Sequence, residues 1–219
     1  LTLFSLAMRR RIGLSERLIM VSTLNLSNMD GVVRVVRHAL IGTFAMEGAG
    51  AAILSLRFIP EAGLAKGLWY GIFHAVSAFC NAGFDLLGWK SGPFSSLAGC
   101  RNDPVVLLTL TALIVVGGLG FFVWEELLVC RSWKRLSAYT KIVLILTSVL
   151  LLGGAAFFFA EEFHNPATLG ELPLGQNLLN ALFQSAPLRP AGFDAIGQGG
   201  LTDSSKALCC ILMLIGGSS

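Results

Sequence analysis

Long uncharged stretches alternate with shorter charged ones along this chain. Residues 105–124 are twenty consecutive positions without Asp, Glu, Lys or Arg, and residues 142–160 are nineteen. A helix needs about 20 apolar residues to cross the roughly 30 Å hydrocarbon core of a bilayer, so both stretches predict membrane-spanning helices. Residues 39–56 predict a third span interrupted only by Glu47, and a fourth apolar stretch begins at Ala207.

The two ends of the chain indicate an internal fragment of a longer sequence. The stretch from Ala207 to Ser219 has too few residues to cross a membrane. Residues 1–8 are largely apolar and are followed by three arginines, which is the reverse of the order in a signal peptide. We therefore expect the chain to start at the end of one helix and to stop within another.

Composition makes lipid the expected solvent for most of the surface. Hydrophobic residues make up 54% of the 219 residues and charged residues only 13%, too few polar groups to surround a soluble core of this size. Nucleic-acid binding is not expected, because the net charge is only +3 and no basic stripe is interleaved with aromatic residues. The five cysteines show no CxxC or Cys/His spacing, so neither a zinc site nor a disulfide framework follows.

The distribution of basic residues argues that two apolar segments enter the membrane without crossing it. Residues 9–37 contain six Lys or Arg and residues 131–141 contain four, so the positive-inside tendency places both segments in the cytoplasm. Both can be cytoplasmic only if the uncharged segment 67–84 dips into the membrane and returns to the side from which it came. Residues 172–188 carry amide side chains, among them Asn177, Asn180 and Gln184, and predict a second re-entrant half-helix.

A short motif occurs twice in these re-entrant segments. The sequence AGFD at residues 82–85 recurs at residues 191–194, 109 positions later. Each copy follows a predicted half-helix and precedes an apolar stretch with paired glycines. The repeated unit is therefore predicted to be a spanning helix, a half-helix, a glycine loop and a second spanning helix. Glycine pairs also serve as close-packing points in membrane helices, but two matched copies in one repeated topology favour a pore.

Such a unit suits a cation. Non-helical backbone at membrane depth leaves carbonyl oxygens without partners, and a dehydrated cation can be the partner that they lack. Gly83 and Gly192 would adopt the dihedral angles that turn these carbonyls toward one axis. The predicted half-helices end near Phe79 and Ala186, so the partial negative charge of each C-terminus would favour a cation at the midplane.

At this point the sequence resembles the Trk/Ktr/HKT superfamily of potassium transporters, with their TrkH/KtrB-like membrane subunits. The resemblance rests on four strings in the order of that family: SAFCNAGF at 77–84, GGLGFFVW at 117–124, RPAGF at 189–193 and IGGSS at 215–219. It implies an all-α integral membrane fold in which four repeated units of helix, re-entrant pore helix with loop, and helix surround one pore, as in K+ channel-like transporters. Residues 1–37 would be the end of the inner helix of repeat one with a cytoplasmic loop, 38–130 repeat two, and 131–219 repeat three with a truncated inner helix.

Matching positions to the family implies a selectivity filter. Its residues would be Cys80, Asn81, Ala82, Gly83 and Phe84 in repeat two, and Arg189, Pro190, Ala191, Gly192 and Phe193 in repeat three. The resemblance implies that K+ is bound by the backbone carbonyls of Asn81, Ala82, Gly83, Pro190, Ala191 and Gly192. A gating loop would begin with Gly216, Gly217, Ser218 and Ser219. Cys80 stands where the family often has asparagine and Pro190 where it often has threonine, which leaves the preference for K+ over Na+ open.

The expected function is uptake of potassium, or of another monovalent cation, by a pore-forming subunit in the bacterial cytoplasmic (inner) membrane. The resemblance implies membrane lipid around a multi-pass chain, a cytosolic nucleotide-binding regulatory subunit (TrkA/KtrA-like), a homodimer of the full-length form, and no organic cofactor. One alternative is a membrane-embedded enzyme that uses Glu47, His74 or Cys80, which predicts polar residues converging from several spans. Another is a non-conducting scaffold subunit, which would leave the duplicated loops without a purpose.

Five side chains in or beside the predicted membrane segments have two interpretations each. Glu47 within a span is expected to have a structural partner in preference to an ion, because a charge at the bilayer centre costs about 2.5–3.5 kcal/mol. Asp85 and Asp194 follow the glycine loops and either concentrate cations or cap nearby backbone. For His74 we expect a packing role, and for Arg189 a hydrogen bond to loop backbone.

Overall fold

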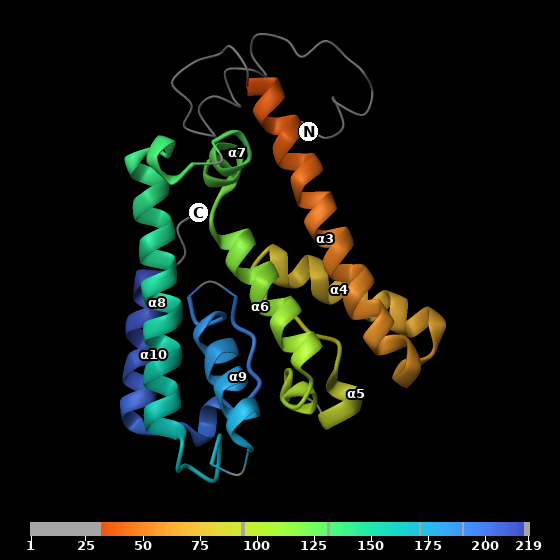
Figure 1. Ribbon diagram of the computed structural model, residues 1–219. Helices are drawn as coiled ribbons and strands as arrows, with labels where there is room; N and C mark the ends of the chain where they lie inside the picture. Colours follow the sequence, from red (N-terminus) through yellow and green to blue (C-terminus); the bar gives the residue numbers. More distant parts are fainter. Residues whose placement is uncertain (1–31, 93–94, 131, 171, 190, 217–219) are drawn as a thin grey trace. The chain divides into compact units, whose positions relative to one another are not determined.

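The computed structural model describes residues 32–216 with the exception of 93–94, 131, 171 and 190. The chain divides into two compact units, Leu1–Thr43 and Phe44–Ser219. In the first unit the described residues belong to the beginning of one helix, so the predicted end of the repeat-one helix lies outside the described residues. The described residues form helices joined by loops, with no β-strand among them (Figure 1). This arrangement confirms the prediction of an all-α fold.

The described helices differ widely in length. The α-helices are α3 (Val32–Ala62), α4 (Leu64–Phe79), α5 (Gly88–Ser91), α6 (Pro104–Gly118), α7 (Phe121–Val129), α8 (Ala138–Glu162), α9 (Leu174–Ser185) and α10 (Asp203–Ile215). Three short 3-10 helices are η1 (Ala98–Cys100), η2 (Trp133–Arg135) and η3 (Gln198–Gly200). Below, α3 to α7 are called the first half of the chain and α8 to α10 the second half.

Two of these helices are long and apolar enough to cross a membrane on their own. They are Arg37–Ala62 within α3 and Ala138–Glu162, which is α8. At about 1.5 Å per residue, 25 residues extend beyond the roughly 30 Å hydrocarbon core. α8 begins after Ser137, whose side chain accepts a hydrogen bond from the N–H of Thr140 as an N-cap.

The uncharged stretch at 105–124 is broken into two helices. α6 ends at Gly118, α7 begins at Phe121, and the two axes differ in direction by 97°. Gly120, the N-cap of α7, has a φ of 84°, a left-handed conformation that glycine adopts without steric cost. The predicted spanning segment is therefore not one straight helix, although the bent pair together is still long and apolar enough to be one broken span. Hydrophobicity reports which residues avoid water, but it does not report a change of direction at a glycine.

Helices α4 and α9 each pack closely against the long helix that precedes them in the chain. In the first half, a Cβ atom added to Gly71 of α4 would overlap Ser55 of α3, and one added to Gly67 would overlap the backbone of Ile59. In the second half, a Cβ atom added to Gly154 of α8 would overlap Ser185 at the end of α9. Small residues of this kind allow helix backbones to approach each other in a membrane protein. The 16 residues of α4 and the 12 of α9 are about 24 Å and 18 Å long, too short to span the core.

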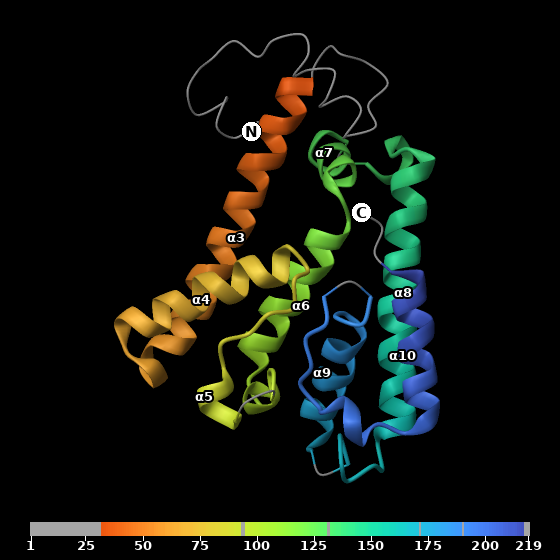
Figure 2. The ribbon, with the colours of Figure 1, turned by 180° about the vertical axis from the view of Figure 1, so that it is seen from behind.

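Helix α9 joins the two halves of the chain. Its residue Phe183 lies in an apolar cluster with residues of α3, α4 and α6, among them Phe58 and Leu110. Its residue Ala181 lies in a second cluster with Phe158 of α8 and with residues of α10. Figure 2 shows α10 running along α8, with α9 between this pair and α6. The core therefore holds α9 in place from two sides.

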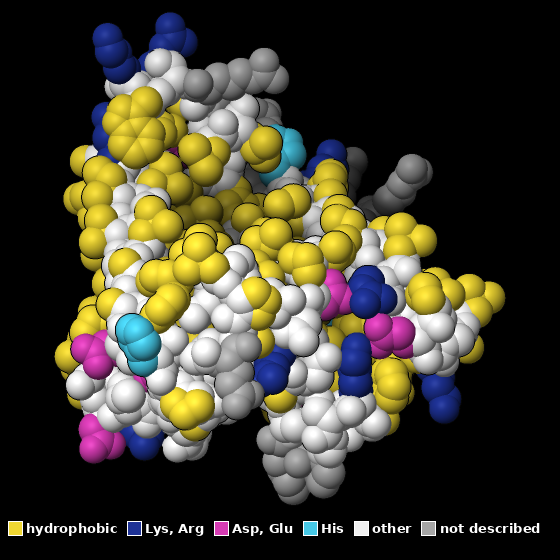
Figure 3. Space-filling view, turned by 60° about the horizontal axis from the view of Figure 1, so that its bottom comes forward, with side chains coloured by type: hydrophobic (Ala, Val, Ile, Leu, Met, Phe, Trp, Pro, Cys, Tyr) yellow, Lys and Arg dark blue, Asp and Glu magenta, His cyan; other side chains and the backbone are white. Residues whose placement is uncertain are grey.

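In each half, a side chain near the end of the long helix bonds to the N-cap residue of a later helix. Arg57 of α3 forms ion pairs with Glu61 at 3.1 Å and with Asp103, the N-cap of α6. Acidic and basic side chains lie next to one another on this face of the molecule (Figure 3). In the second half, Glu162 at the end of α8 accepts hydrogen bonds from the N–H and the Oγ1 of Thr202, the N-cap of α10, at 3.0 and 2.9 Å. Both halves therefore link the end of a long helix to the N-cap of a later helix, by an ion pair in the first half and by hydrogen bonds in the second.

Candidate functional site

The first glycine loop folds back onto the end of α4. The N–H of Cys80 donates to the carbonyl oxygen of Val76 at 2.9 Å, and the N–H of Ala82 donates to that of Ser77 at 2.8 Å. Asn81 and Gly83 then take left-handed conformations, with φ of 53° and 72°. Helical hydrogen bonding therefore stops where the motif begins.

The second glycine loop has a matching backbone conformation after α9. The N–H groups of Ala191 and Gly192 both donate to the carbonyl oxygen of Pro187, at 2.8 and 2.9 Å. Gly192 has a φ of 73°, within 1° of the value at Gly83. The two copies of the sequence motif therefore share a backbone conformation that an L side chain rarely adopts.

The two loops touch each other. A Cβ atom added to Gly83 would overlap the carbonyl oxygen of Ala191 and would lie 3.0 Å from the carbonyl carbon of that residue. The same atom would lie 3.3 Å from the carbonyl carbon of Gly192. Because each loop directly follows a helix C-terminus, the partial negative charges of α4 and α9 are both directed at this meeting point.

Several carbonyl oxygens at the meeting point have no hydrogen-bond donor among the described residues. They are those of Asn81, Ala82, Gly83, Ala191 and Gly192. The side-chain oxygen of Asn81 is buried and equally without a donor among the residues described. Unpaired oxygen acceptors at membrane depth cost several kcal/mol each unless water or an ion satisfies them. Hard alkali cations are bound by oxygen ligands of this kind.

Side chains of α4 fix the segment that follows the first loop. The hydroxyl of Ser77 donates to the carbonyl oxygen of Phe84 at 2.7 Å. The N–H of Leu86 donates to Nε2 of His74 at 3.3 Å, while Nδ1 of that ring lies 2.7 Å from the carbonyl oxygen of Tyr70. This pair of contacts requires the proton on Nδ1. His74 is fully buried and both ring nitrogens are bonded, so it holds the loop in position as the packing interpretation predicts.

The two halves are also bonded to each other just beyond the loops. Ser96 accepts a hydrogen bond from the N–H of Asp194 at 3.2 Å, and the N–H of Leu97 donates to the carbonyl oxygen of Asp194 at 2.8 Å. The carboxylate of Asp194 accepts from three consecutive N–H groups, those of residues 196–198. Asp85 likewise caps the N–H of Leu87 at 3.1 Å. Asp85 and Asp194 therefore both make the contacts of the capping interpretation, in which the carboxylate accepts from nearby backbone N–H groups.

Glu47 has a neighbour that adjoins the first loop. Its Oε1 lies 3.8 Å from the Sγ of Cys80, the residue that ends α4. Both side chains retain some exposure. The described residues contain no group of three or more His, Cys, Asp or Glu side chains placed to hold a metal ion. The described oxygen atoms without a donor at this site are the loop carbonyls and the Oδ1 of Asn81.

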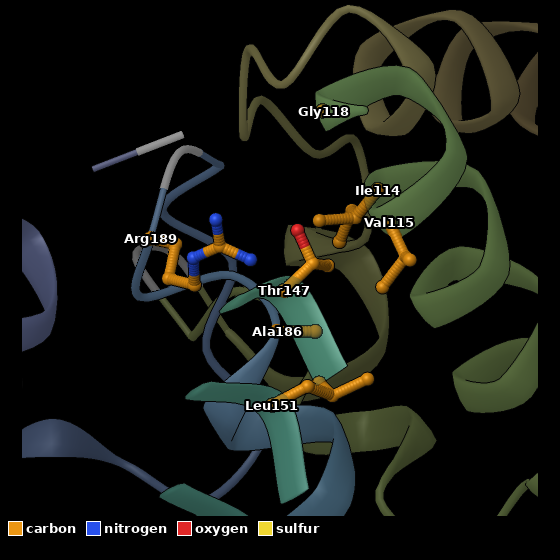
Figure 4. A pocket seen from close by; sticks show the side chains of 7 residues that line it. All are labelled: Ile114, Val115, Gly118, Thr147, Leu151, Ala186 and Arg189. Atoms are coloured by element: carbon orange, nitrogen blue, oxygen red, sulfur yellow. The ribbon is translucent and has the colours of Figure 1, made fainter. Parts of the chain in front are cut away.

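Arg189 lies beside the second loop, but its side chain bonds to a different segment. Its Nε donates to the carbonyl oxygen of Gly216, the C-cap of α10, at 3.2 Å. The sequence predicts that Arg189 bonds to the backbone of its own loop. The structure instead shows a bond to the backbone at the end of α10, 27 residues away. The guanidinium points into a small cavity toward Thr147 and Ile114 (Figure 4). Burial lowers the pKa of Arg189 from its ordinary value.

The structure thus places the predicted residues in two groups. The residues of both motifs lie in loops that meet, while Gly216 lies at the end of α10, bonded to Arg189. Pro190, Gly217, Ser218 and Ser219 lie outside the described residues. Sequence reasoning did not single out Ser77, Ser96 or Glu162, although each is a polar residue next to an apolar run.

The fold and the loops define an all-α membrane protein built on a repeated unit with a short re-entrant helix. A family model described as a cation transport protein, TrkH, matches residues 14–219, and the chain belongs to this family. Family membership confirms the resemblance, and the family is one of cation transport proteins, not of membrane-embedded enzymes. It also places the chain among the multi-pass proteins of the bacterial cytoplasmic membrane.

Curated relatives match nearly the whole chain. The chain is 38% identical over 217 residues to the potassium/sodium uptake protein NtpJ of Enterococcus hirae, covering 99% of this chain and 47% of that protein. It is 35% and 37% identical to the Ktr system potassium uptake protein B of Bacillus subtilis and of Vibrio alginolyticus. These matches cover 96% and 95% of this chain and 46% and 45% of the two relatives. The chain therefore spans about half the length of the curated relatives it matches.

Proposed function

We propose that the two glycine loops are adjacent sides of a selectivity filter that admits a dehydrated monovalent cation. The observation that carries the proposal is the contact between Gly83 and the carbonyl oxygen of Ala191. It brings two backbone segments with unbonded carbonyls together at the ends of two half-helices. Carbonyl oxygens so placed replace the water shell of an entering ion.

The carbonyl ligands are those of residues 81–83 and 190–192, with Cys80, Phe84, Arg189 and Phe193 flanking them. K+ is the first candidate ion, since relatives are named as potassium uptake proteins, and Na+ is the second, since one is named as a potassium/sodium uptake protein. The full-length protein then takes up this cation through a pore to which the present chain contributes two sides. The repeat boundaries at residues 38–130 and 131–219 follow from the same proposal.

The proposal also includes regulation of cation uptake by a second subunit. Two of the relatives are named as components of a Ktr system, which supports a further subunit in that system. We propose a cytosolic nucleotide-binding subunit that docks on the two basic segments, residues 9–37 and 131–141. The full-length protein assembles as a homodimer, with a gating loop that begins at Gly216 and continues through residues 217–219.

Uptake of Rb+ by the full-length protein tests the filter. In cells that lack other potassium uptake, Gly83→Asp places a carboxylate against the carbonyl of Ala191 and should reduce Rb+ uptake at least tenfold. Gly197→Asp is the matched control. Gly197 has a similar φ of 79°, and a Cβ atom added there meets nothing within 4 Å. Equal uptake by wild type and Gly83→Asp, at equal amounts of protein in the membrane, would remove the filter proposal.

A further inference from the structure

The sequence GGLGFFVW at residues 117–124 lies against the end of the first half-helix. α4 packs against α6 (Figure 2), and a Cβ atom added to Gly117 of α6 would overlap the carbonyl oxygen of Phe79. The same atom would lie 2.9 Å from the carbonyl carbon of that residue. Phe79 is the last residue of α4 and leads into the first glycine loop. The backbone of α6 therefore limits how the end of α4 can lie.

Trp124 contacts both the bend between α6 and α7 and the ring of Phe79. Its indole N–H donates to the carbonyl oxygen of Val116 at 2.9 Å, which ties the first turn of α7 to the end of α6. Its ring meets that of Phe79 in an edge contact, with 5.3 Å between the ring centroids. Edge contacts between aromatic rings are favourable. One side chain therefore fixes the 97° bend and the end of α4 to each other.

The surroundings of these contacts are closely packed. Phe79 is only 6% exposed and lies in the apolar cluster that also contains Phe183 of α9, and Trp124 packs against the same cluster. Phe121 makes a second edge contact with Trp124, with 5.8 Å between the centroids. Neighbours in a close-packed interior shift when the volume of a side chain changes. A change of ring at Trp124 is therefore expected to displace Phe79 and, with it, the start of the first loop.

We propose that Trp124 and Gly117 are positioning residues that hold Phe79 in place and thereby set the arrangement of the carbonyls of residues 81–83. That arrangement decides how well the loop replaces the water shell of a given cation. The two residues thus influence the preference between K+ and Na+ by acting through Phe79. The inference rests on the proposed function, because the carbonyl arrangement has this effect only if ions pass the first loop.

The test measures Rb+ influx into proteoliposomes that contain the purified full-length protein, at increasing concentrations of Na+. The measured quantity is the ratio of the inhibition constant of Na+ to the KM for Rb+. Trp124→Leu removes both the indole N–H and the aromatic ring, and it should lower this ratio at least threefold. Trp124→Phe removes the N–H but keeps an aromatic ring for Phe79, so it should lower the ratio less.

Two further variants approach Phe79 from other directions. Gly117→Ala brings a methyl group against the carbonyl of Phe79 and should also lower the ratio at least threefold. Phe79→Leu and Trp124→Leu form a double-mutant cycle, in which the double variant should equal the larger single effect because Trp124 acts through Phe79. If Trp124→Leu does not fold, Trp124→Phe takes its place in the cycle.

Matched controls separate positioning from general packing. Phe122 is the neighbour of Phe121 in the same sequence, is 38% exposed and makes none of the ring contacts found among the described residues, so Phe122→Leu should leave the ratio unchanged. Gly153→Ala should leave it unchanged as well, because a Cβ atom there meets nothing within 4 Å. An equal change in Phe122→Leu, or additive effects in the cycle, would overturn the proposal.

A purely structural role gives a different result. It predicts less functional protein, and hence a lower maximal influx, with an unchanged ratio in the variants of Trp124 and Gly117, and this result would overturn the proposal. If Gly83→Asp abolishes Rb+ influx while these variants keep the ratio of wild type, the filter stands and the positioning role is wrong. If Gly83→Asp has no effect, the filter itself is wrong, whatever the outcome at Trp124.

Discussion

A methyl group on the Cα atom of Gly83 would overlap the carbonyl oxygen of Ala191, a residue 108 positions further along the chain. Gly83 and Gly192 share a left-handed backbone conformation, with φ of 72° and 73°. Contact and matched conformation together mean that two copies of one motif form neighbouring sides of one site. The absence of a side chain at Gly83 is a condition for that contact.

Gly83→Ala is therefore expected to separate the loops and to impair ion selection. The substitution adds a steric overlap with backbone to the cost of placing an L residue at positive φ, which alone is about 1–2 kcal/mol. We predict at least a tenfold fall in Rb+ uptake and a smaller ratio of K+ to Na+ in competition measurements. Gly197→Ala has the same kind of conformational cost without the overlap, so it should retain near-normal uptake.

The adjacent glycines of α8 allow a test of helix packing. A Cβ atom on Gly154 would overlap the hydroxyl of Ser185, which in turn donates to the carbonyl oxygen of Leu151 at 2.9 Å. A Cβ atom on Gly153 meets nothing within 4 Å. We predict that Gly154→Ala destabilises the protein by about 1–3 kcal/mol through overpacking. Thermal unfolding in detergent should show a lower midpoint for Gly154→Ala and an equal or higher midpoint for Gly153→Ala.

Glu162 is predicted to be a buried structural carboxylate. It accepts hydrogen bonds from Asn165 at 2.6 Å and Thr168 at 2.7 Å in addition to those from Thr202, and its side chain is fully buried. Glu162→Gln turns an amide N–H₂ group toward these donors, so the unfolding free energy should fall by about 1–3 kcal/mol. The exposed neighbour supplies the control, since Glu161→Gln should change the unfolding free energy by no more than about 0.5 kcal/mol.

Some features of the fold could be predicted because they depend on local composition. The uncharged stretch at 142–160 lies within α8, and the half-helices predicted to end near Phe79 and Ala186 end at Phe79 and Ser185. The break in the stretch 105–124 could not be predicted in the same way. The chain turns at the left-handed Gly120, and the indole N–H of Trp124 donates back to the carbonyl oxygen of Val116 at 2.9 Å across the bend.

The site also has features that the sequence predicts and features that depend on contacts between distant parts of the chain. The repeated motif predicted which two glycines take a special conformation, because only glycine tolerates it easily. The sequence could not show that the loops meet, nor that Ser96 and Leu97 hold Asp194, because these contacts join positions about 100 residues apart. The side-chain bonds of Arg189 and Glu162 likewise depend on tertiary packing that no local pattern encodes.

The position of a bound ion tests the central claim most directly. Crystals of the full-length protein soaked in Tl+ or Rb+ should show anomalous density beside the carbonyl oxygens of Gly83 and Ala191. The same density should weaken on exchange into Na+ if the site prefers the larger ion. Anomalous density that lies only away from both loops, or loop carbonyls that are all bonded to protein donors, would contradict the account.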